Sequence, residues 1–244
     1  MIEIRNLTKS FGSNLVWRDV SFEIEDGETV AIIGRSGCGK SVLVKHFNAL
    51  IYPDAGEVII DGENVFELGY IPLRKIRQRF GVLFQGSALF DSINTFENIA
   101  FPLRYFTDLG EGEIAEKVNY ALERVNLADA GSKSLSELSG GMKRRVALAR
   151  ATIQQPDYLI YDEPTSGLDP QTSEEINQLI ISLADDLNIT SIVVTHDIHS
   201  VLNIADRVAF LNDQRLAWHG RLEEMRRSDN RELMEFITAS EYTI

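Results

Sequence analysis

The residues whose types and spacing best suit phosphate binding form a glycine-rich run, Gly34 to Ser41, with the sequence GRSGCGKS. It follows an apolar stretch, Thr29–Ile33, that predicts a buried strand, and it opens a segment that predicts a helix over Ser41–Leu50. In that context the pattern G-x-x-x-x-G-K-S brings backbone N–H groups close to phosphate oxygens, and the helix start adds partial positive charge. We therefore predict a nucleotide-binding phosphate loop rather than a glycine-rich turn with a chance lysine.

The loop is expected to contact the nucleotide along its whole length. Lys40 can reach the β- and γ-phosphates as a catalytic residue, and the Ser41 hydroxyl can ligate Mg²⁺. Cys38 leaves two alternatives: the helix start and Lys40 lower the pKa of the thiol, or the thiol is a small, buried and inert side chain. The residues assigned to nucleotide contact are Gly34, Arg35, Ser36, Gly37, Cys38, Gly39, Lys40 and Ser41.

A second apolar segment, Tyr158–Tyr161, predicts a strand that ends in two acids, Asp162 and Glu163. A carboxylate at a strand end can hold Mg²⁺, and the carboxylate after it can polarise an attacking water molecule. The alternative is an exposed acidic turn, which the phosphate loop earlier in the chain disfavours. Asp162 is therefore expected to be a metal ligand and Glu163 a general base.

A third candidate site is the run Ser139-Gly140-Gly141, which opens a helix predicted over Met142–Ile153. Its N–H groups and the Ser139 hydroxyl form another site for an anion. A chain with two phosphate-binding helix starts and one nucleotide is unusual. The economical arrangement is a dimer in which this second site completes the nucleotide pocket of the partner.

With these motifs the chain resembles the ATP-binding cassette (ABC) family of transport ATPases. The matching segments are GRSGCGKS, LSGGM, YLIYDEP, SGLD at Ser166–Asp169 and the histidine of SIVVTH, and the resemblance runs from Ile2 to about Gly220. Three further positions match the family: Gln85, which follows a strand predicted at Phe80–Phe84, Phe11 in KSFG, and His196.

The resemblance implies a role for each matching residue. Phe11 would stack on adenine, and Gln85 would contact Mg²⁺ or the attacking water and couple the site to a membrane partner. Ser139, Gly140 and Gly141 would cap the γ-phosphate held by the other protomer, and Asp169 would line the dimer interface. His196 would hydrogen-bond the γ-phosphate and hold Glu163 and water in line.

One residue departs from the usual family pattern. Met142 stands where most members have Gln, and a thioether cannot replace the hydrogen bonds of an amide. The sequence LSGGM resembles the branch of Mla and related MCE-associated lipid transporters, and the stretch Leu83–Arg104 is similar to that branch as well. The branch implies phospholipid or other lipid cargo and an MCE-domain partner.

The elements that must position these residues alternate between short apolar strands and longer amphipathic helices, which predicts an α/β fold. We expect a P-loop NTPase core with a parallel sheet, a small antiparallel β-subdomain and a helical subdomain, the ABC ATPase fold. Residues 1–85 and 156–225 would form the core with its β-subdomain, residues 86–155 the helical subdomain, and residues 226–244 a tail, all in one domain of 244 residues. Helical spacing predicts that Leu43, Phe47 and Leu50 lie on one buried face.

Composition narrows the possible partners. The net charge of -13 argues against a dedicated nucleic-acid binder, and one cysteine excludes an intramolecular disulfide framework. No apolar run approaches the roughly 18 residues that span a bilayer. Together with these exclusions, the family resemblance implies a peripheral protein at the cytoplasmic face of the inner membrane, bound to a separate integral membrane permease, with no nucleic acid.

Three features leave alternatives open. A basic cluster before the Gln85 strand is either a solvated helix face or a site for nucleic acid or lipid headgroups; it consists of Arg74, Lys75, Arg77 and Arg79. A second basic run after the LSGGM motif either tunes the potential near phosphates or lies on an exposed turn; it is Lys143-Arg144-Arg145. Four aromatic residues either belong to the core or contact a coupling helix; they are Phe84, Phe90, Phe96 and Phe101.

The sequence as a whole predicts an ATPase subunit that dimerises head to tail on MgATP and drives a permease, with lipid as the expected cargo. The alternatives are the ATPase subunit of another ABC importer or exporter, a cluster-assembly ABC ATPase without a permease, and a nucleotide-binding scaffold without turnover. Intact Glu163 and His196 argue against the scaffold. The tail, with Leu233, Phe236 and Ile237 at helical spacing, packs either on its own domain or on a second copy.

Overall fold

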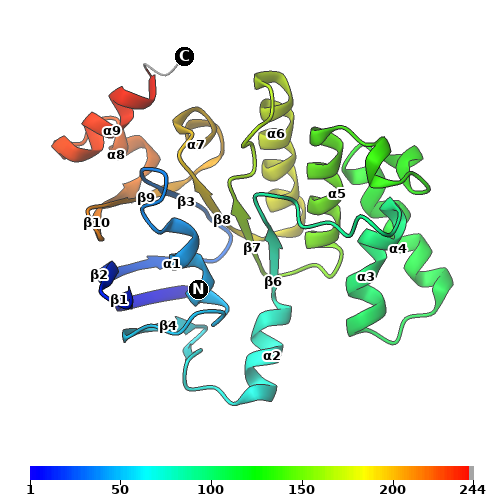
Figure 1. The fold of residues 1–244 in the computed structure, drawn as a ribbon, viewed down its shortest axis with the longest axis horizontal. Coiled ribbons are helices and arrows are strands. Elements are labelled where there is room, and N and C mark those ends of the chain that lie inside the picture. Colours follow the sequence, from blue (N-terminus) through cyan, green and yellow to red (C-terminus); the bar gives the residue numbers. More distant parts are fainter. Residues whose placement is uncertain (242–244) are drawn as a thin grey trace.

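A six-stranded sheet forms the centre of the computed structural model, which describes residues 1–241 (Figure 1). Its order is β10-β9-β3-β8-β7-β6, with β10 antiparallel to β9 and the other neighbours parallel. Every residue of β3 and β8 is buried, which explains why these strands are continuous apolar runs. The strands are β3 (Thr29–Ile33), β6 (Phe80–Leu83), β7 (Tyr158–Asp162), β8 (Thr190–Thr195), β9 (Arg207–Asn212) and β10 (Arg215–Arg221).

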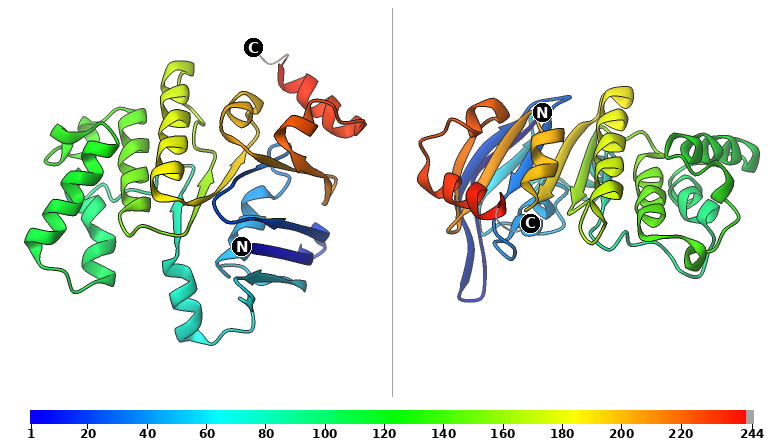
Figure 2. Two further views of the ribbon diagram at one scale, coloured as in Figure 1. Left: turned by 180° about the vertical axis from the view of Figure 1, so that it is seen from behind. Right: turned by 90° about the horizontal axis from the view of Figure 1, so that it is seen from above.

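A smaller antiparallel sheet of order β2-β1-β4-β5 lies at one end of the molecule (Figure 2). Helix α1 (Lys40–Phe47) packs between it and the central sheet: Trp17 of β2 and Leu43 of α1 share one hydrophobic cluster with Ile32 of β3. This cluster anchors the segment that carries the glycine-rich loop. The strands are β1 (Ile2–Phe11), β2 (Asn14–Ile24), β4 (Ala55–Ile60) and β5 (Glu63–Asn64).

Helices α3 to α5 gather at the other end of the elongated molecule (Figure 2). Their core is continuous with the opposite face of the central sheet, because Leu103 of α3, Val118 of α4 and Val146 of α5 belong to the same cluster as Val193 of β8. Helix α6 completes this layer. The helices are α3 (Thr95–Phe106), α4 (Glu111–Arg124), α5 (Gly140–Thr152) and α6 (Pro170–Leu187), with 3₁₀ turns at Ala128–Ala130 and Leu135–Glu137.

The C-terminal segment packs on its own domain as far as residue 241. Leu233, Phe236 and Ile237 are buried in one cluster with Phe210 of β9 and Met225. The part of the predicted tail from 242 to 244 lies outside the described residues. The helices here are α7 (Ile198–Ile204), α8 (Leu222–Met225) and α9 (Arg231–Glu241), and α2 (Tyr70–Gln78) precedes β6. No helix within residues 1–241 is both long and apolar enough to cross a bilayer.

The helix after the glycine-rich loop is shorter than expected. It ends at Phe47, and Ala49 adopts a left-handed conformation with φ 51°. Leu43 and Phe47 are buried as predicted, but Leu50 is 55% exposed because the chain has turned away from the helical face. A periodic pattern cannot show where a helix stops when no glycine or proline marks the end.

The expectation of a solvated basic cluster holds for only part of it. Arg77 donates to the carbonyl oxygens of Asn48 and Ala49 and thereby caps the end of α1. Arg79 pairs with Asp61 and Asp157. These two arginines join segments of the fold, so the solvated-face interpretation is wrong for them.

Of the two alternatives for the four phenylalanines, the core role is wrong for three of them. Phe84, Phe90 and Phe101 are each at least 40% exposed, whereas Phe96 packs against the helical core. Their rings form part of an open surface. The interpretation that they contact a partner stays a prediction.

Candidate functional site

The glycine-rich loop is held close to its surroundings, so that two of its glycines have no room for a side chain. A Cβ on Gly34 would lie 2.4 Å from the carbonyl oxygen of Leu211, and a Cβ on Gly39 would lie 2.5 Å from Cγ1 of Val16. Gly39 also has a positive φ of 99° at the start of α1. The loop therefore wraps the N-terminus of α1 with its backbone, as the motif predicts.

Lys40 lies at the centre of this loop with its side chain almost fully buried. Its ammonium group donates to the carbonyl oxygens of Gly34 at 2.8 Å and Arg35 at 3.2 Å. The same nitrogen is 4.0 Å from Oε1 of Glu163. A buried positive charge thus stands between the loop and the acidic end of β7, where a phosphate group with its negative charge would be stabilised.

The two residues predicted to hold a metal are in direct contact. The Ser41 hydroxyl donates to Oδ1 of Asp162 at 2.9 Å. Burial raises the pKa of Asp162, and the nearby Glu163 adds to the rise, while the Ser41 hydrogen bond opposes it. Such a desolvated carboxylate gains from a cation beside it. The oxygen donors fit Mg²⁺, which is bound by one or two protein oxygens together with substrate phosphates.

Residues 1–241 contain no cluster of three His, Cys, Asp or Glu residues that would hold a metal ion by itself. This agrees with the donor set of a hydroxyl and one carboxylate at Ser41 and Asp162. A metal here would need further oxygens from a bound nucleotide.

Glu163 is fixed by its backbone and by both carboxylate oxygens. It has a positive φ of 51°, and its N–H donates to the carbonyl oxygen of Val194 at 2.8 Å. Nδ1 of His196 donates to Oε1 at 2.9 Å, and the Thr195 hydroxyl donates to Oε2 at 3.3 Å. The parallel register pairs Asp162 with Val194, so the ends of β7 and β8 bring these groups together. A strained backbone conformation at such a position is typical of functional sites.

Thr195 is a contact that the sequence did not single out. It stands directly before His196 in the SIVVTH motif. The signal that could have identified it is a hydroxyl at the end of a strand that neighbours the strand ending in Asp162 and Glu163.

Gln85 lies at the same edge of the sheet. The last residue of β6, Leu83, pairs with Tyr161 of β7, so Gln85 follows at the level of the acidic pair. Its side chain is exposed, and no hydrogen bond in the described part of the chain joins it to Ser41 or Asp162. Its place agrees with the prediction, but the structure brings only its backbone into contact with other functional segments.

The serine and glycines of the LSGGM motif occupy the start of α5, away from the phosphate loop. Ser139 is the N-cap, and its hydroxyl accepts the N–H of Met142 at 3.2 Å. Ser139 and Gly140 are exposed. Helices α1 and α5 lie on different sides of β7 in Figure 1, and no hydrogen bond among residues 1–241 links Ser139 to Lys40 or Glu163.

Asp169 and Met142 have local partners. The Asp169 carboxylate caps α6 by accepting the N–H of Thr172 at 3.0 Å and its hydroxyl at 2.6 Å, and these bonds lower the pKa of Asp169. Asp169 is exposed, so it remains open to a second chain. Met142 is partly buried against the helical core, a contact that a thioether makes well.

Phe11 stands at the tip of the hairpin between β1 and β2, paired with Asn14. Its ring is half exposed, and the Lys9 ammonium lies 5.2 Å from the ring centroid. An open aromatic face of this kind can stack on a base. No contact in residues 1–241 joins it to the phosphate loop.

The first alternative for Cys38, a lowered thiol pKa, is wrong. The Cys38 side chain packs against the core beneath the loop, and burial raises its pKa by more than Lys40 lowers it. The thiolate is therefore scarce at neutral pH, which makes the thiol a poor nucleophile.

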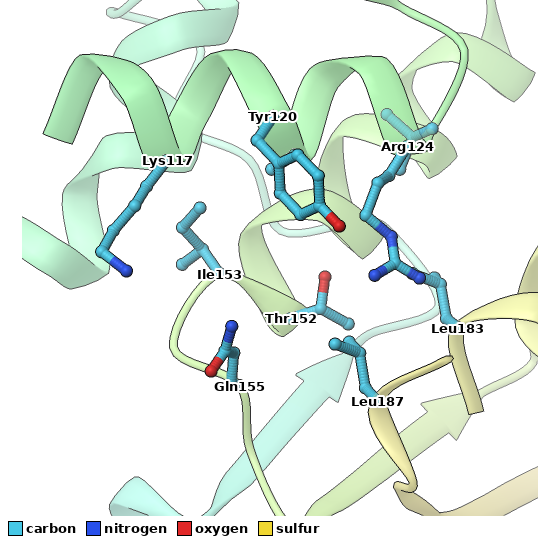
Figure 3. Close-up of a pocket in the computed structure, with 10 residues that line it drawn as sticks. Lys117, Tyr120, Arg124, Thr152, Ile153, Gln155, Leu183 and Leu187 are labelled. Atoms are coloured by element: carbon cyan, nitrogen blue, oxygen red, sulfur yellow. The ribbon is translucent and has the colours of Figure 1, made fainter. Parts of the chain in front are cut away.

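A hollow elsewhere in the molecule has two cations in its lining, Lys117 and Arg124, but no carboxylate. It lies between α4 and the ends of α5 and α6, where Tyr120 covers apolar side chains such as Ile153 and Leu187 (Figure 3). None of the predicted site residues lines it. The chemistry-bearing groups instead meet at the carboxyl ends of β3, β7 and β8.

Comparisons with known proteins find relatives over nearly the whole chain. Residues 17–166 match the model of the family described as ABC transporter. The phospholipid transport ATP-binding protein MlaF of Haemophilus influenzae is 40% identical over 97% of this chain and 90% of its own. A probable ribonucleotide transport ATP-binding protein, mkl of Mycobacterium leprae, is 39% identical over 97% of this chain and 68% of its own.

A solved structure shows the same fold in an assembled state. It is the dimeric ATP-binding cassette MJ0796 in a post-hydrolysis state with ADP and phosphate bound, which has a TM-score of 0.82 and 32% identity and covers 91% of this chain and 99% of its own. The chain therefore belongs to the ABC transporter family and is an ATPase subunit of that family.

Proposed function

We propose that Glu163 is the general base of ATP hydrolysis and that Lys40 and His196 hold it beside the phosphate to be cleaved. The observation that carries this assignment is the position of one carboxylate oxygen, 2.9 Å from Nδ1 of His196 and 4.0 Å from the Lys40 ammonium. A carboxylate fixed in this way can accept a proton from an attacking water molecule.

The remaining groups of the site bind and orient the nucleotide. Backbone N–H groups of the loop and the Lys40 ammonium contact the phosphates, and the His196 ring orients the carboxylate by donating from Nδ1. As an imidazolium, His196 would also donate from Nε2 to the γ-phosphate. Ser41, Asp162 and Gln85 would hold Mg²⁺. When bound, Mg²⁺ neutralises charge on the β- and γ-phosphates. Catalysis is then mostly positioning and charge stabilisation.

The second half of each nucleotide pocket comes from another copy of the chain. Ser139, Gly140 and Gly141 begin a helix of 13 residues with exposed N–H groups, which attract an anion. Within residues 1–241, no residue assigned to nucleotide binding at the phosphate loop is hydrogen-bonded to them. A head-to-tail dimer brings this helix start onto the γ-phosphate of the partner, with Asp169 at the interface. The dimeric form of MJ0796 supports the arrangement.

An exposed aromatic surface beside the Gln85 loop fits a membrane permease. We define it by four rings of one helix and the loop before it: Phe90, Phe101, Tyr105 and Phe106. Adjacent ring centroids lie 4.9, 6.2 and 4.7 Å apart along this row. Contiguous exposed aromatic residues mark interaction sites. Binding there places the ATPase at the cytoplasmic face of the membrane, where ATP is present.

Phospholipid is the proposed cargo of the whole transporter, and an MCE-domain protein is its proposed further partner. The support is the 40% identity to MlaF, which extends over nearly the whole chain. A second candidate is ribonucleotide transport, because the mkl protein is 39% identical to this chain.

The test is purification from native membranes followed by transport assays in proteoliposomes. We expect a multi-helix permease to co-purify and fluorescent phospholipid to move between vesicles in an ATP-dependent way. The Glu163→Gln complex is the matched control and should move none. Movement of radiolabelled ribonucleotide without phospholipid would replace the cargo assignment, and recovery only with non-membrane proteins would favour a cluster-assembly ATPase.

A further inference from the structure

Arg144, two residues after Met142, is a buried cation whose place the sequence did not reveal. It is only 5% exposed, so the exposed turn does not describe it. No carboxylate among residues 1–241 lies within ion-pair distance of it. Burial lowers the pKa of its guanidinium, and the buried Nε finds no acceptor in the described chain.

A buried charge without a counter-ion is costly to the folded state. An apolar side chain of similar length in the same place would avoid that cost. We therefore look for the role of Arg144 in the segments that its guanidinium hydrogen-bonds and not in the net stability of the fold.

The guanidinium joins two catalytic loops to the helix that carries it. One terminal nitrogen of Arg144 donates to the carbonyl oxygens of Phe84 at 3.0 Å and Gln85 at 2.8 Å. The other donates to the carbonyl oxygen of Ser166 at 3.4 Å. Ser166 in turn donates its N–H to the carbonyl oxygen of Glu163 at 3.2 Å. One side chain thus spans the loop after β6, the loop after β7 and the helix α5.

A second guanidinium reinforces the hold on the first loop. Arg150, also on α5, donates to the carbonyl oxygens of Ser87 and Ala88, each at 2.9 Å. Both of these residues have positive φ angles, 61° and 47°. Four carbonyl oxygens of a single tight loop are therefore bound to α5. That loop is tied to the helix more firmly than its exposed side chains suggest.

We propose that Arg144 is a positioning residue that makes the start of α5, the Gln85 loop and the segment Ser166–Asp169 move as one piece. The proposal rests on the proposed function, in which α5 docks on the nucleotide of the partner. When that docking occurs, the planar fork of Arg144 carries the same displacement to Gln85 and to the segment that follows Glu163. An ammonium group cannot span three carbonyl oxygens in two loops, so Arg and Lys are not equivalent here.

The test compares Arg144→Met and Arg144→Lys with the matched variant Arg145→Met. Arg145 neighbours it on α5, but its hydrogen bonds in the described part of the chain go to the carbonyl oxygen of Val125 and the carboxylate of Glu175. Because small displacements of reacting groups are costly, both Arg144 variants should lower kcat by about ten- to a hundredfold. KM for ATP and the affinity of the isolated subunit for a fluorescent ATP analogue should change little. Arg145→Met should keep kcat even if its Tm falls.

Hydrogen exchange supplies a readout that stability alone does not move. In the wild-type protein, MgATP should slow amide exchange in residues 84–88 and 166–169 together, and in Arg144→Lys this joint protection should be lost. Unchanged kcat in both Arg144 variants would overturn the proposal. So would a loss of kcat that merely follows Tm across all three variants. The Glu163→Gln variant distinguishes failure of the proposed function from failure of the Arg144 proposal. Normal turnover in Glu163→Gln would remove Glu163 as the general base, but it would leave the comparison of the Arg144 and Arg145 variants unchanged.

Discussion

The starts of helices α1 and α5 are both built to attract an anion, yet they are equipped very differently. At α1 the buried Lys40 ammonium lies within ion-pair distance of Glu163, and the Ser41 hydroxyl donates to Asp162. At α5 a serine caps the helix and two glycines follow it, and no acidic or basic side chain among residues 1–241 is hydrogen-bonded to Ser139. Both sites attract an anion electrostatically, but in the described chain only α1 has acidic side chains in hydrogen-bond or ion-pair contact with its first two residues.

The sheet explains the difference. Parallel register brings the carboxyl ends of β3, β7 and β8 to one edge, and α1 starts there. Helix α5 instead ends beside that sheet and begins in the helical region, so its start faces outward. A helix N-terminus attracts phosphate wherever it lies, whereas catalysis requires several strand ends. The α1 site therefore carries the acids and the lysine, and in the proposed dimer the α5 site of the partner completes its pocket.

The sharpest way to break this comparison is to neutralise the base at the α1 site. Glu163→Gln should slow ATP hydrolysis by at least about a hundredfold, because the amide cannot take a proton from water. Hydrogen bonding to His196 is retained, so ATP binding should stay close to the wild-type level and ATP-bound dimers should accumulate. Phosphate release and size-exclusion chromatography with MgATP check both. Near-normal turnover would remove Glu163 from this role.

The α5 site can be tested by blocking it without touching α1. Ser139→Arg should leave ATP binding to the same chain intact but lower ATP-driven dimerisation and turnover at least about tenfold, since a bulky cation replaces a hydroxyl at a closed interface. Light scattering and phosphate release measure the two effects.

A mixing experiment provides the control. Lys40→Ala disables the α1 site only, so a mixture with Ser139→Arg contains one composite site with both halves intact. The mixture should dimerise with MgATP when neither variant does so alone. Full dimerisation and hydrolysis by Ser139→Arg alone would contradict the head-to-tail arrangement.

Asp162→Asn sharpens the comparison by separating function from stability. Burial raises the pKa of Asp162, so the folded state loses stability as the pH rises through that pKa and the carboxyl group ionises. The variant should therefore have a higher Tm than the wild type at neutral pH, with a smaller difference in acid. Its Mg²⁺-dependent ATPase activity should fall by about tenfold or more. Thermal scans of both proteins without nucleotide, from acidic to neutral pH, measure the two Tm values. A higher Tm for the wild type at neutral pH would contradict the prediction.

Features that depend on local sequence pattern could be predicted, and features that depend on contacts distant in the sequence could not. Strand β3 was placed at its observed bounds, because a strand buried on both faces is a continuous apolar run. The contact of Ser41 with Asp162 also followed from motifs at the ends of predicted strands. Such features depend on local pattern and on the parallel sheet that the pattern implies.

The failures concern side chains whose partners are backbone groups far away in the sequence. The pattern favours a solvated face for Arg77, and for Arg144 it leaves open tuning of the potential near phosphates or an exposed turn. Both residues instead bind carbonyl oxygens, Arg77 at the end of α1 and Arg144 in the Gln85 loop. The residue type shows that a side chain is charged, but it does not show which carbonyl oxygens the fold leaves without hydrogen-bond partners. Leu50 failed for a related reason, since the end of α1 depends on the conformation of Ala49.

The smallest effect is expected at Cys38, inside the α1 site but not part of its chemistry. Burial against the core raises the pKa of its thiol, so maleimide labelling should be slow at neutral pH and accelerate as the pH rises. Cys38→Ser should keep kcat within about twofold, because the two side chains are of similar size and the phosphate needs only the backbone N–H of the loop.

Nucleotide protection then distinguishes the two faces of the loop. If the thiol lies beneath the loop, as its core contacts indicate, saturating MgATP should slow labelling only by stiffening the loop. Labelling measured by intact mass at several pH values, with and without MgATP, gives both rates. Rapid modification at neutral pH that MgATP abolishes would place the thiol on the nucleotide face. The difference between α1 and α5 would then include a reactive group at α1 as well as its buried acids and lysine.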